Sequence, residues 1–131
     1  MIIDQTLLDS LSALAKANPR LRQSYDLRTT PDDNSQRMLN ALEPGTIMSI
    51  HRHKNTSETM VMVRGKLIER FYDDSGNVIE EFVMEPCGQC VMVQIEAGRW
   101  HSLEVLEEGT IIFETKDGAY APISEEDMIN K

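Results

Sequence analysis

From residue 46 onward the sequence consists of short stretches in which apolar and polar residues alternate, with turn residues between them. A period of two is typical of half-buried strands, and strands spaced about ten residues apart are typical of β-sandwiches and barrels. Asp74-Ser-Gly76-Asn77 is a strong hairpin turn signal. No strand alternates with a helix in this region, so we expect an all-β fold rather than a parallel α/β sheet. The expected strands begin at Thr46 and continue at 59–64, 66–73, 78–84, 89–95, 101–106 and 110–116.

The beginning of the chain has a helical period instead. Asp4 is a suitable N-cap for a helix that carries Leu7, Leu11 and Leu14 on one stripe, flanked by Leu8 and Ala15. Pro19 follows at a position where a helix is expected to have ended.

Residues 19–32 are polar and predict a loop with a short strand near Tyr25. A second short helix is expected from Asp33, because Gln36 stands three residues later, as in a capping box. Its apolar face would consist of Met38, Leu39 and Leu42, and Pro44-Gly45 would end it.

The chain contains no internal repeat and no linker composition, which predicts a single domain. Within it we expect a helical N-terminal arm at 1–44, a β-barrel core at 45–122 and a tail at 123–131. The tail contains Ser124-Glu-Glu-Asp, which favours one turn of helix.

The net charge of −9 argues against a nucleic-acid partner, because 13 basic residues are scattered among 22 acidic ones. The sequence has no apolar run long enough to span a bilayer, so no membrane partner is expected. The N-terminus lacks the features of a signal peptide, and we therefore expect a cytoplasmic protein.

Cys87 and Cys90 are the two cysteines of the chain. A zinc knuckle would need further cysteines, and a redox dithiol would be expected to open a helix. The pair instead precedes a predicted strand, so we interpret it as part of a turn with small, partly buried thiols.

All three histidines occur in two short segments, His51-Arg-His53 and Gly98-Arg-Trp-His101. Residues i and i+2 of a strand project from the same face, so both His51 and His53 could reach one ion. Glu58 is far enough along the chain to enter the neighbouring strand and face the same interior, and His101 would come from a distant strand. These four residues predict a metal site.

Three imidazoles and one carboxylate suit Fe(II), Mn, Ni, Cu or Zn and are poor ligands for Mg or Ca. An octahedral ion would keep open positions for water or a substrate, whereas a tetrahedral zinc ion would be saturated and structural. The sequence does not choose between these. The residues that share parity with the ligands would line a largely apolar cavity, namely Ile47, Ser49, Met60, Met62, Leu103 and Val105.

The segment from Gly45 to Gly65, with His51, His53 and Glu58 between them, resembles the first motif of the cupin superfamily. Gly88, Gly98 and His101 resemble the second motif. Glu96 and Val105 depart from it where cupins usually carry Pro and Asn, and neither position holds a metal ligand in that family. The resemblance implies a jelly-roll β-barrel with a short helical N-terminal arm.

A narrower resemblance covers residues 36–45, 51–53, 97–102 and 113–122, which are similar to the WbuC family of cupin-fold metalloproteins. It implies metal ligands at His51, His53, Glu58 and His101, and the occurrence of that family with polysaccharide and O-antigen genes suggests carbohydrate chemistry. The recurring segments also supply candidates for substrate binding or for attaching the arm to the barrel, namely Arg37, Asn40, Glu114, Lys116 and Tyr120.

Three functions remain open at this point. The first is a metal-dependent enzyme that acts on a small polar or sugar-derived substrate, with one divalent ion of Fe, Mn, Ni or Zn. The second is a non-catalytic module that binds or senses a small molecule, and in the third the metal only braces the barrel. A metal-free epimerase is disfavoured, because it would need a histidine that is not committed to metal. The resemblance also implies a homodimer.

Overall fold

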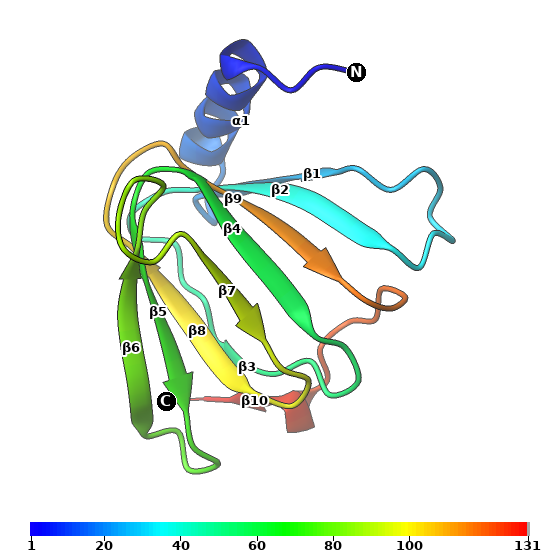
Figure 1. Ribbon diagram of the computed structural model, residues 1–131, viewed down its shortest axis with the longest axis vertical. Coiled ribbons are helices and arrows are strands. Elements are labelled where there is room, and N and C mark those ends of the chain that lie inside the picture. Colours follow the sequence, from blue (N-terminus) through cyan, green and yellow to red (C-terminus); the bar gives the residue numbers. More distant parts are fainter. Residues whose placement is uncertain (131) are drawn as a thin grey trace.

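The computed structural model describes residues 1–130 and consists of two antiparallel sheets that face each other, with one helix beside them (Figure 1). The helical elements are α1 (Gln5–Ala17) and the 3-10 turn η1 (Glu125–Asp127). The strands are β1 (Arg22–Asp26), β2 (Gln36–Leu42), β3 (Ile50–His51), β4 (Glu58–Arg64), β5 (Leu67–Tyr72), β6 (Val78–Met84), β7 (Met92–Ile95), β8 (Trp100–Val105), β9 (Thr110–Lys116) and β10 (Met128–Ile129).

One sheet has the strand order β1-β2-β9-β4-β7 and the other has the order β10-β3-β8-β5-β6. Most neighbours in each sheet are distant in sequence, and every described pair is antiparallel. The expected all-β jelly-roll architecture is therefore confirmed. None of the helices among residues 1–130 has the length and apolar character needed to cross a membrane.

The space between the sheets is apolar toward one end. β4 and β5 alternate buried and half-buried residues along their length, as strands with one inward face do. The inward residues pack into a continuous core of Leu42, Met60, Met62, Leu67, Met84, Leu103, Val105 and Ile112. The polar side chains between the sheets lie at the opposite end of the same space.

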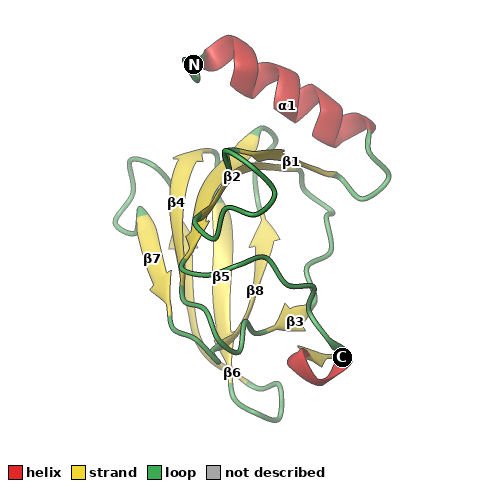
Figure 2. Ribbon diagram, turned by 90° about the vertical axis from the view of Figure 1, so that its right-hand side faces the viewer, coloured by secondary structure: helices red, strands yellow, loops and turns green. Residues whose placement is uncertain are grey.

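Helix α1 covers the outer face of the first sheet (Figure 2). The predicted N-cap is confirmed, because the Asp4 carboxylate accepts a hydrogen bond from the Leu7 backbone at 3.0 Å. The predicted stripe is displaced by about one residue, since Leu14 is 54% exposed. Leu11 and the two predicted flanking residues, Leu8 and Ala15, pack against Leu39, Ala41 and Ile111.

The helix expected after Asp33 is wrong, because Gln36–Leu42 forms strand β2. All seven of its residues are in register with β9, which satisfies the backbone. Leu39 and Ala41 pack against α1, while Leu42 faces the core, so apolar residues on both faces hid the strand period. The supposed capping residue Asp33 instead accepts a hydrogen bond from the Ser35 backbone in a local turn.

This correction also changes the predicted subdivision of the chain. β1 and β2 lie within the predicted helical arm at 1–44, yet they are strands of the first sheet. β10 lies within the predicted tail and pairs with β3. The sheets thus draw on residues from both sides of the predicted core at 45–122.

The remaining strands lie close to their predicted places. The Asp73 carboxylate accepts hydrogen bonds from the backbones of Ser75 and Asn77 in the predicted hairpin turn. The predicted strand at 89–95 is shorter, since β7 begins at Met92, and the free thiols of Cys87 and Cys90 occupy the turn before it. The strand predicted from Thr46 is reduced to Ile50–His51.

Candidate metal centre

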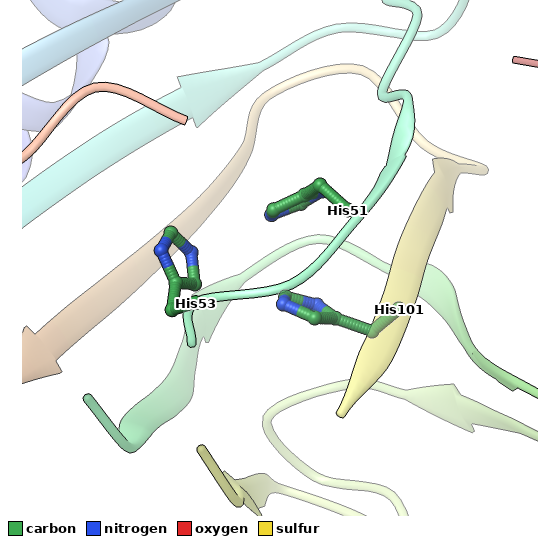
Figure 3. Close-up of side chains that lie close together, drawn as sticks. All are labelled: His51, His53 and His101. Carbon is green, nitrogen blue, oxygen red and sulfur yellow. The ribbon is translucent and has the colours of Figure 1, made fainter. Parts of the chain in front are cut away.

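Two strands of the second sheet bring the three histidines together. His51 and His101 are direct partners in the β3–β8 ladder, and His53 follows β3 by two residues. Their imidazole rings point toward one another in Figure 3, and one ring nitrogen of each lies within 4.8 Å of those of the other two. β3 contains only two residues and is held on its other edge by β10, where Met128 pairs with His51.

Hydrogen bonds orient two of the rings. The His51 Nδ1–H group donates to the Ser49 carbonyl at 2.8 Å, so its Nε2 carries the free lone pair. His101 Nδ1 lies 3.1 Å from Glu69 Oε1. Burial lowers the pKa of His101 to about 3, with the neighbouring histidines adding to this effect, and burial also lowers the pKa of His51. Both rings are therefore neutral near pH 7, which is the state that binds metal.

Glu58 begins β4 and supplies a carboxylate beside the histidines. One of its oxygens, Oε2, lies 3.4 Å from His53 Nε2 and 3.9 Å from His101 Nε2. Burial opposes its ionisation, but interactions with His53 and Glu114 prevail and hold its pKa below the usual range. The residue is buried and anionic, as a carboxylate ligand must be.

The residues fit a metal ion by a second criterion. Within residues 1–130, the buried side-chain atoms that lack a hydrogen-bond partner include Glu58 Oε2 and His101 Nε2. Buried polar atoms are normally satisfied; the Glu58 oxygen has the lone pair that a cation requires, and so has Nε2 of His101 in the tautomer that carries its proton on Nδ1. Three imidazole nitrogens and one carboxylate form a donor set suited to a divalent transition metal.

The cluster lies in the wall of a cavity of about 690 Å³. The first sheet contributes a polar group to this cavity, in which the Asn40 amide donates to Glu114 Oε1 and the Lys116 ammonium lies 3.6 Å from Glu114 Oε2. Burial raises the pKa of Glu114, and the negative charge of Glu58 raises it further. The cavity thus combines a candidate metal centre with separate proton donors and acceptors.

Residues 117–123 form part of the cavity rim. The Gln36 amide donates to the Gly118 carbonyl at 2.9 Å, and the Asp117 carboxylate accepts two hydrogen bonds from Ser57. Arg52 and Asp127 also line the cavity, and Arg52 binds the Asp127 carboxylate at 2.8 Å. Because Arg52 separates His51 from His53, this contact also fixes the segment that carries both histidines.

A model of the family described as a domain of unknown function, DUF6016, matches residues 3–84. The chain belongs to this family. Three of the candidate ligands lie within the matched part and His101 lies beyond it. No curated protein matches the sequence.

Several solved structures resemble this DUF6016 protein. KdgF from Halomonas sp. is 14% identical with a TM-score of 0.62, and 79% of this chain and 84% of KdgF are covered. CapF from Staphylococcus aureus, a capsular polysaccharide assembling protein, is 24% identical with a TM-score of 0.66, covering 86% of this chain and 32% of CapF. Oxalate decarboxylase from Bacillus subtilis is 24% identical with a TM-score of 0.58, covering 82% and 27%.

These neighbours are cupin-fold proteins, and the chain shares that fold. This chain spans only about a third of CapF and about a quarter of the decarboxylase. The narrower likeness to the WbuC family stays a prediction, because the matching family model carries no assigned function.

The predicted cavity lining of this DUF6016 protein needs correction. Met60 and Leu103 line the cavity, whereas Met62 and Val105 lie in the apolar core. Ile47 is 82% exposed, because the short β3 does not extend back to it.

Ser49 also fails to line the cavity, and acts instead through its carbonyl on His51. Among the predicted substrate candidates, Glu114, Lys116 and Tyr120 line the cavity. Arg37 does not, because it points outward from β2 and binds Asp33 at 3.1 Å, together with the carbonyls of Leu27 and Ser35.

One residue in the cavity wall was missed by sequence reasoning. Glu69 is fully buried on β5 and contacts His101. Burial, with the negative charges of Glu58 and Glu114, raises its pKa well above the ordinary value. A signal did exist, since Glu69 shares parity with the apolar Leu67 and Phe71 in a predicted strand.

Proposed function

We propose that this protein binds one divalent transition metal ion through His51, His53, Glu58 and His101. The observation that carries this proposal is the cluster of three imidazoles, two of them buried, beside which Nε2 of His101 and Oε2 of Glu58 have no hydrogen-bond partner among residues 1–130. A bound ion of Fe, Mn, Ni or Zn would supply a Lewis acid at the cavity wall. The Mn(II) centers of the Bacillus subtilis oxalate decarboxylase, a cupin neighbour, are in keeping with this assignment.

The ligand that we propose is a small polar molecule derived from a carbohydrate. Asn40, Lys116 and the carboxyl of Glu114 would hydrogen-bond its hydroxyl or carboxylate groups, and Tyr120 would contact it at the rim. CapF, one of the structural neighbours, takes part in capsular polysaccharide assembly. Together with the WbuC-like segments, this supports a role in polysaccharide or O-antigen metabolism.

Catalysis would require a group that transfers a proton, and the three histidines are committed to the metal. Glu114 is the best placed candidate, because it is half-buried beside Glu58 with a raised pKa. Lys116, 3.6 Å away, would hold the carboxyl in place and bind the anionic part of a ligand. If Glu114 serves only to bind, the protein is a non-catalytic module for the same class of ligand.

The first test is the metal content of the purified parent beside His51→Ala and His101→Ala variants. We expect about one equivalent of a transition metal in the parent and its loss in both variants, because each removes one of three clustered imidazoles. Glu104→Gln is the matched control, since it removes an exposed carboxylate from the strand that carries His101. Metal retained by both histidine variants would refute the shared site.

The second test separates an enzyme from a binding module. The metal-loaded protein would be incubated with nucleotide sugars and uronic acids, and both thermal shift and product formation would be recorded. A thermal shift with turnover that Glu114→Gln abolishes supports the enzyme, whereas a shift without turnover supports the module. The absence of any shift, with metal bound, would argue against a carbohydrate-derived ligand.

We also propose that the protein forms a homodimer. The support is the cupin resemblance, together with exposed apolar residues on β6 and β7, two strands at the edges of their sheets. These residues are Val78, Ile79, Val83 and Met92. Light scattering of the purified protein would measure the mass directly, and a monomer at high concentration would contradict the proposal.

A further inference from the structure

Glu69 occupies an unfavourable place for a carboxylate that has no function. It is 0% exposed, in the middle of β5, and the residues before and after it on the same face are Leu67 and Phe71. Within residues 1–130, its Oε2 is among the few buried side-chain atoms that lack a hydrogen-bond partner. Burying a carboxylate costs free energy that an apolar residue at the same position would not cost. The contact that Glu69 does make is therefore informative.

That contact is with a candidate metal ligand. Glu69 Oε1 lies 3.1 Å from His101 Nδ1, across the β5–β8 ladder, in which Phe71 pairs with His101. A neutral imidazole that binds a cation through Nε2 must carry its proton on Nδ1. In the metal-bound protein, Glu69 Oε1 is thus positioned as the acceptor of that proton.

The two oriented histidines differ in the kind of acceptor that holds them. His51 donates to the carbonyl of Ser49, which is neutral, whereas His101 faces a carboxylate. A carboxylate behind a metal-bound imidazole both orients the ring and raises its basicity.

We propose that Glu69 is a positioning residue for the metal, which holds His101 with Nε2 toward the ion. This inference rests on the proposed metal site. On this view, burying the Glu69 carboxyl lowers the stability of the fold, and its benefit is a higher affinity for the metal.

The test compares Glu69→Leu and Glu69→Gln with the parent, using Co(II) as the probe. Affinity would be measured by competition with a chromophoric chelator, and the Co(II) absorption spectrum would be recorded for each protein. We expect affinity to fall about 10- to 100-fold in Glu69→Leu, with a changed spectrum, because the hydrogen bond that orients the His101 ring is lost. Glu69→Gln keeps an oxygen that can accept the Nδ1 proton, so we expect a smaller loss.

Tyr72→Phe is the matched control. It removes a buried side-chain hydrogen bond, 2.6 Å to Ser102 Oγ, from the same strand, β5. We expect its Co(II) affinity and spectrum to equal those of the parent. A weakening as large as that of Glu69→Leu would show that any disturbance of β5 loosens the site, and would overturn the specific role of Glu69.

Melting temperatures without metal separate the proposal from a purely structural role. A structural role predicts that Glu69→Leu melts at a lower temperature than the parent, whereas our proposal predicts an equal or higher melting temperature. If Glu69→Leu does not fold, the Co(II) affinity is compared between the parent and Glu69→Gln, which is nearly isosteric with it. Parental affinity and spectrum in the Gln and Leu variants would refute this inference alone, whereas a parent that binds no Co(II) would refute the metal site itself.

Discussion

Strands β4, β5, β8 and β9 change in chemical character along their length. Toward one end of the space between the sheets, their inward side chains are apolar and tightly packed: Met62, Leu67, Val105 and Ile112. Toward the other end they are polar and line the cavity: Glu58, Glu69, His101 and Glu114. The β4–β9 and β5–β8 ladders run through both ends. The apolar core at one end therefore also holds the backbone that carries the polar side chains at the other end. Substitutions should therefore separate stability from binding.

The largest effect on stability is expected at the apolar end. Leu67→Ala should lower the free energy of unfolding of the metal-free protein by about 2–5 kcal/mol, because Leu67 is 0% exposed and its removal leaves a cavity. Urea denaturation would measure this, and metal binding by the remaining folded protein should be unchanged. Leu14→Ala, at a residue of α1 that is 54% exposed, is the control and should change stability by less than about 0.5 kcal/mol. Equal losses of stability in the two variants would show that the apolar end of the space between the sheets is not the main source of stability.

At the polar end, the main effect should be on stabilisation by metal. A ligand at 100 times its dissociation constant stabilises the folded state by about 2.7 kcal/mol. His101→Ala should remove this increment, since His101 is central to the candidate site. Thermal unfolding with and without added Zn(II) would measure the increment in parent and variant. An increment that survives in the variant would place the metal elsewhere.

Acid should affect the two ends differently. The pKa of His101 is lowered to about 3 by burial, whereas an unfolded histidine titrates near its ordinary value. Between these values the unfolded chain binds more protons, so the metal-free protein loses stability as the pH falls. From pH 7 to pH 5 we expect this histidine to account for a loss on the order of 1–2 kcal/mol.

His101→Gln should remove that part of the pH dependence, and Leu67→Ala should retain it. Urea denaturation at both pH values, for parent and variants, measures the difference. An identical pH dependence in the parent and His101→Gln would show that His101 is not the group that titrates.

The smallest effect is expected on the outside of the polar end. Arg37 lies on β2 next to Gln36, yet it points away from the cavity and forms a partly exposed ion pair with Asp33. Arg37→Ala should change stability by about 0–1 kcal/mol and leave metal and ligand binding unchanged. Calorimetric titration of both proteins with metal would check this. Weaker binding of metal or ligand by Arg37→Ala would show that Arg37 does contribute to the site.

The sequence predicted the parts of the molecule that depend on local patterns. Alternation and turn residues located the strands after residue 45, because strands such as β4 and β5 present one face to the core. The spacing of His51 and His53, and the absence of histidines elsewhere, indicated a cluster that the structure brings together with His101. Residues two apart can share a face whatever the tertiary structure, so this signal needs no knowledge of neighbours.

The errors arose where distant segments decide the outcome. β2 was mistaken for a helix because α1 buries its outer face, which removes the polar half of the alternation. Ile47 and Ser49 were placed in the cavity because β3 was expected to be longer than two residues. Glu69 could be assigned a role only once β5 was known to lie beside His101. In each case the missing information was which strand is the neighbour.

The pairing of β3 with β8 and β10 has a consequence for how the protein acquires metal. His51 meets His101 and Met128 only after segments far apart in the sequence have paired, and such long-range pairing is slow. His51, His53 and Glu58 alone are a partial binding site on an unfolded chain. Loading of the complete centre must therefore follow folding. In a refolding experiment, metal supplied after the chain has folded should fill the centre as completely as metal present from the start.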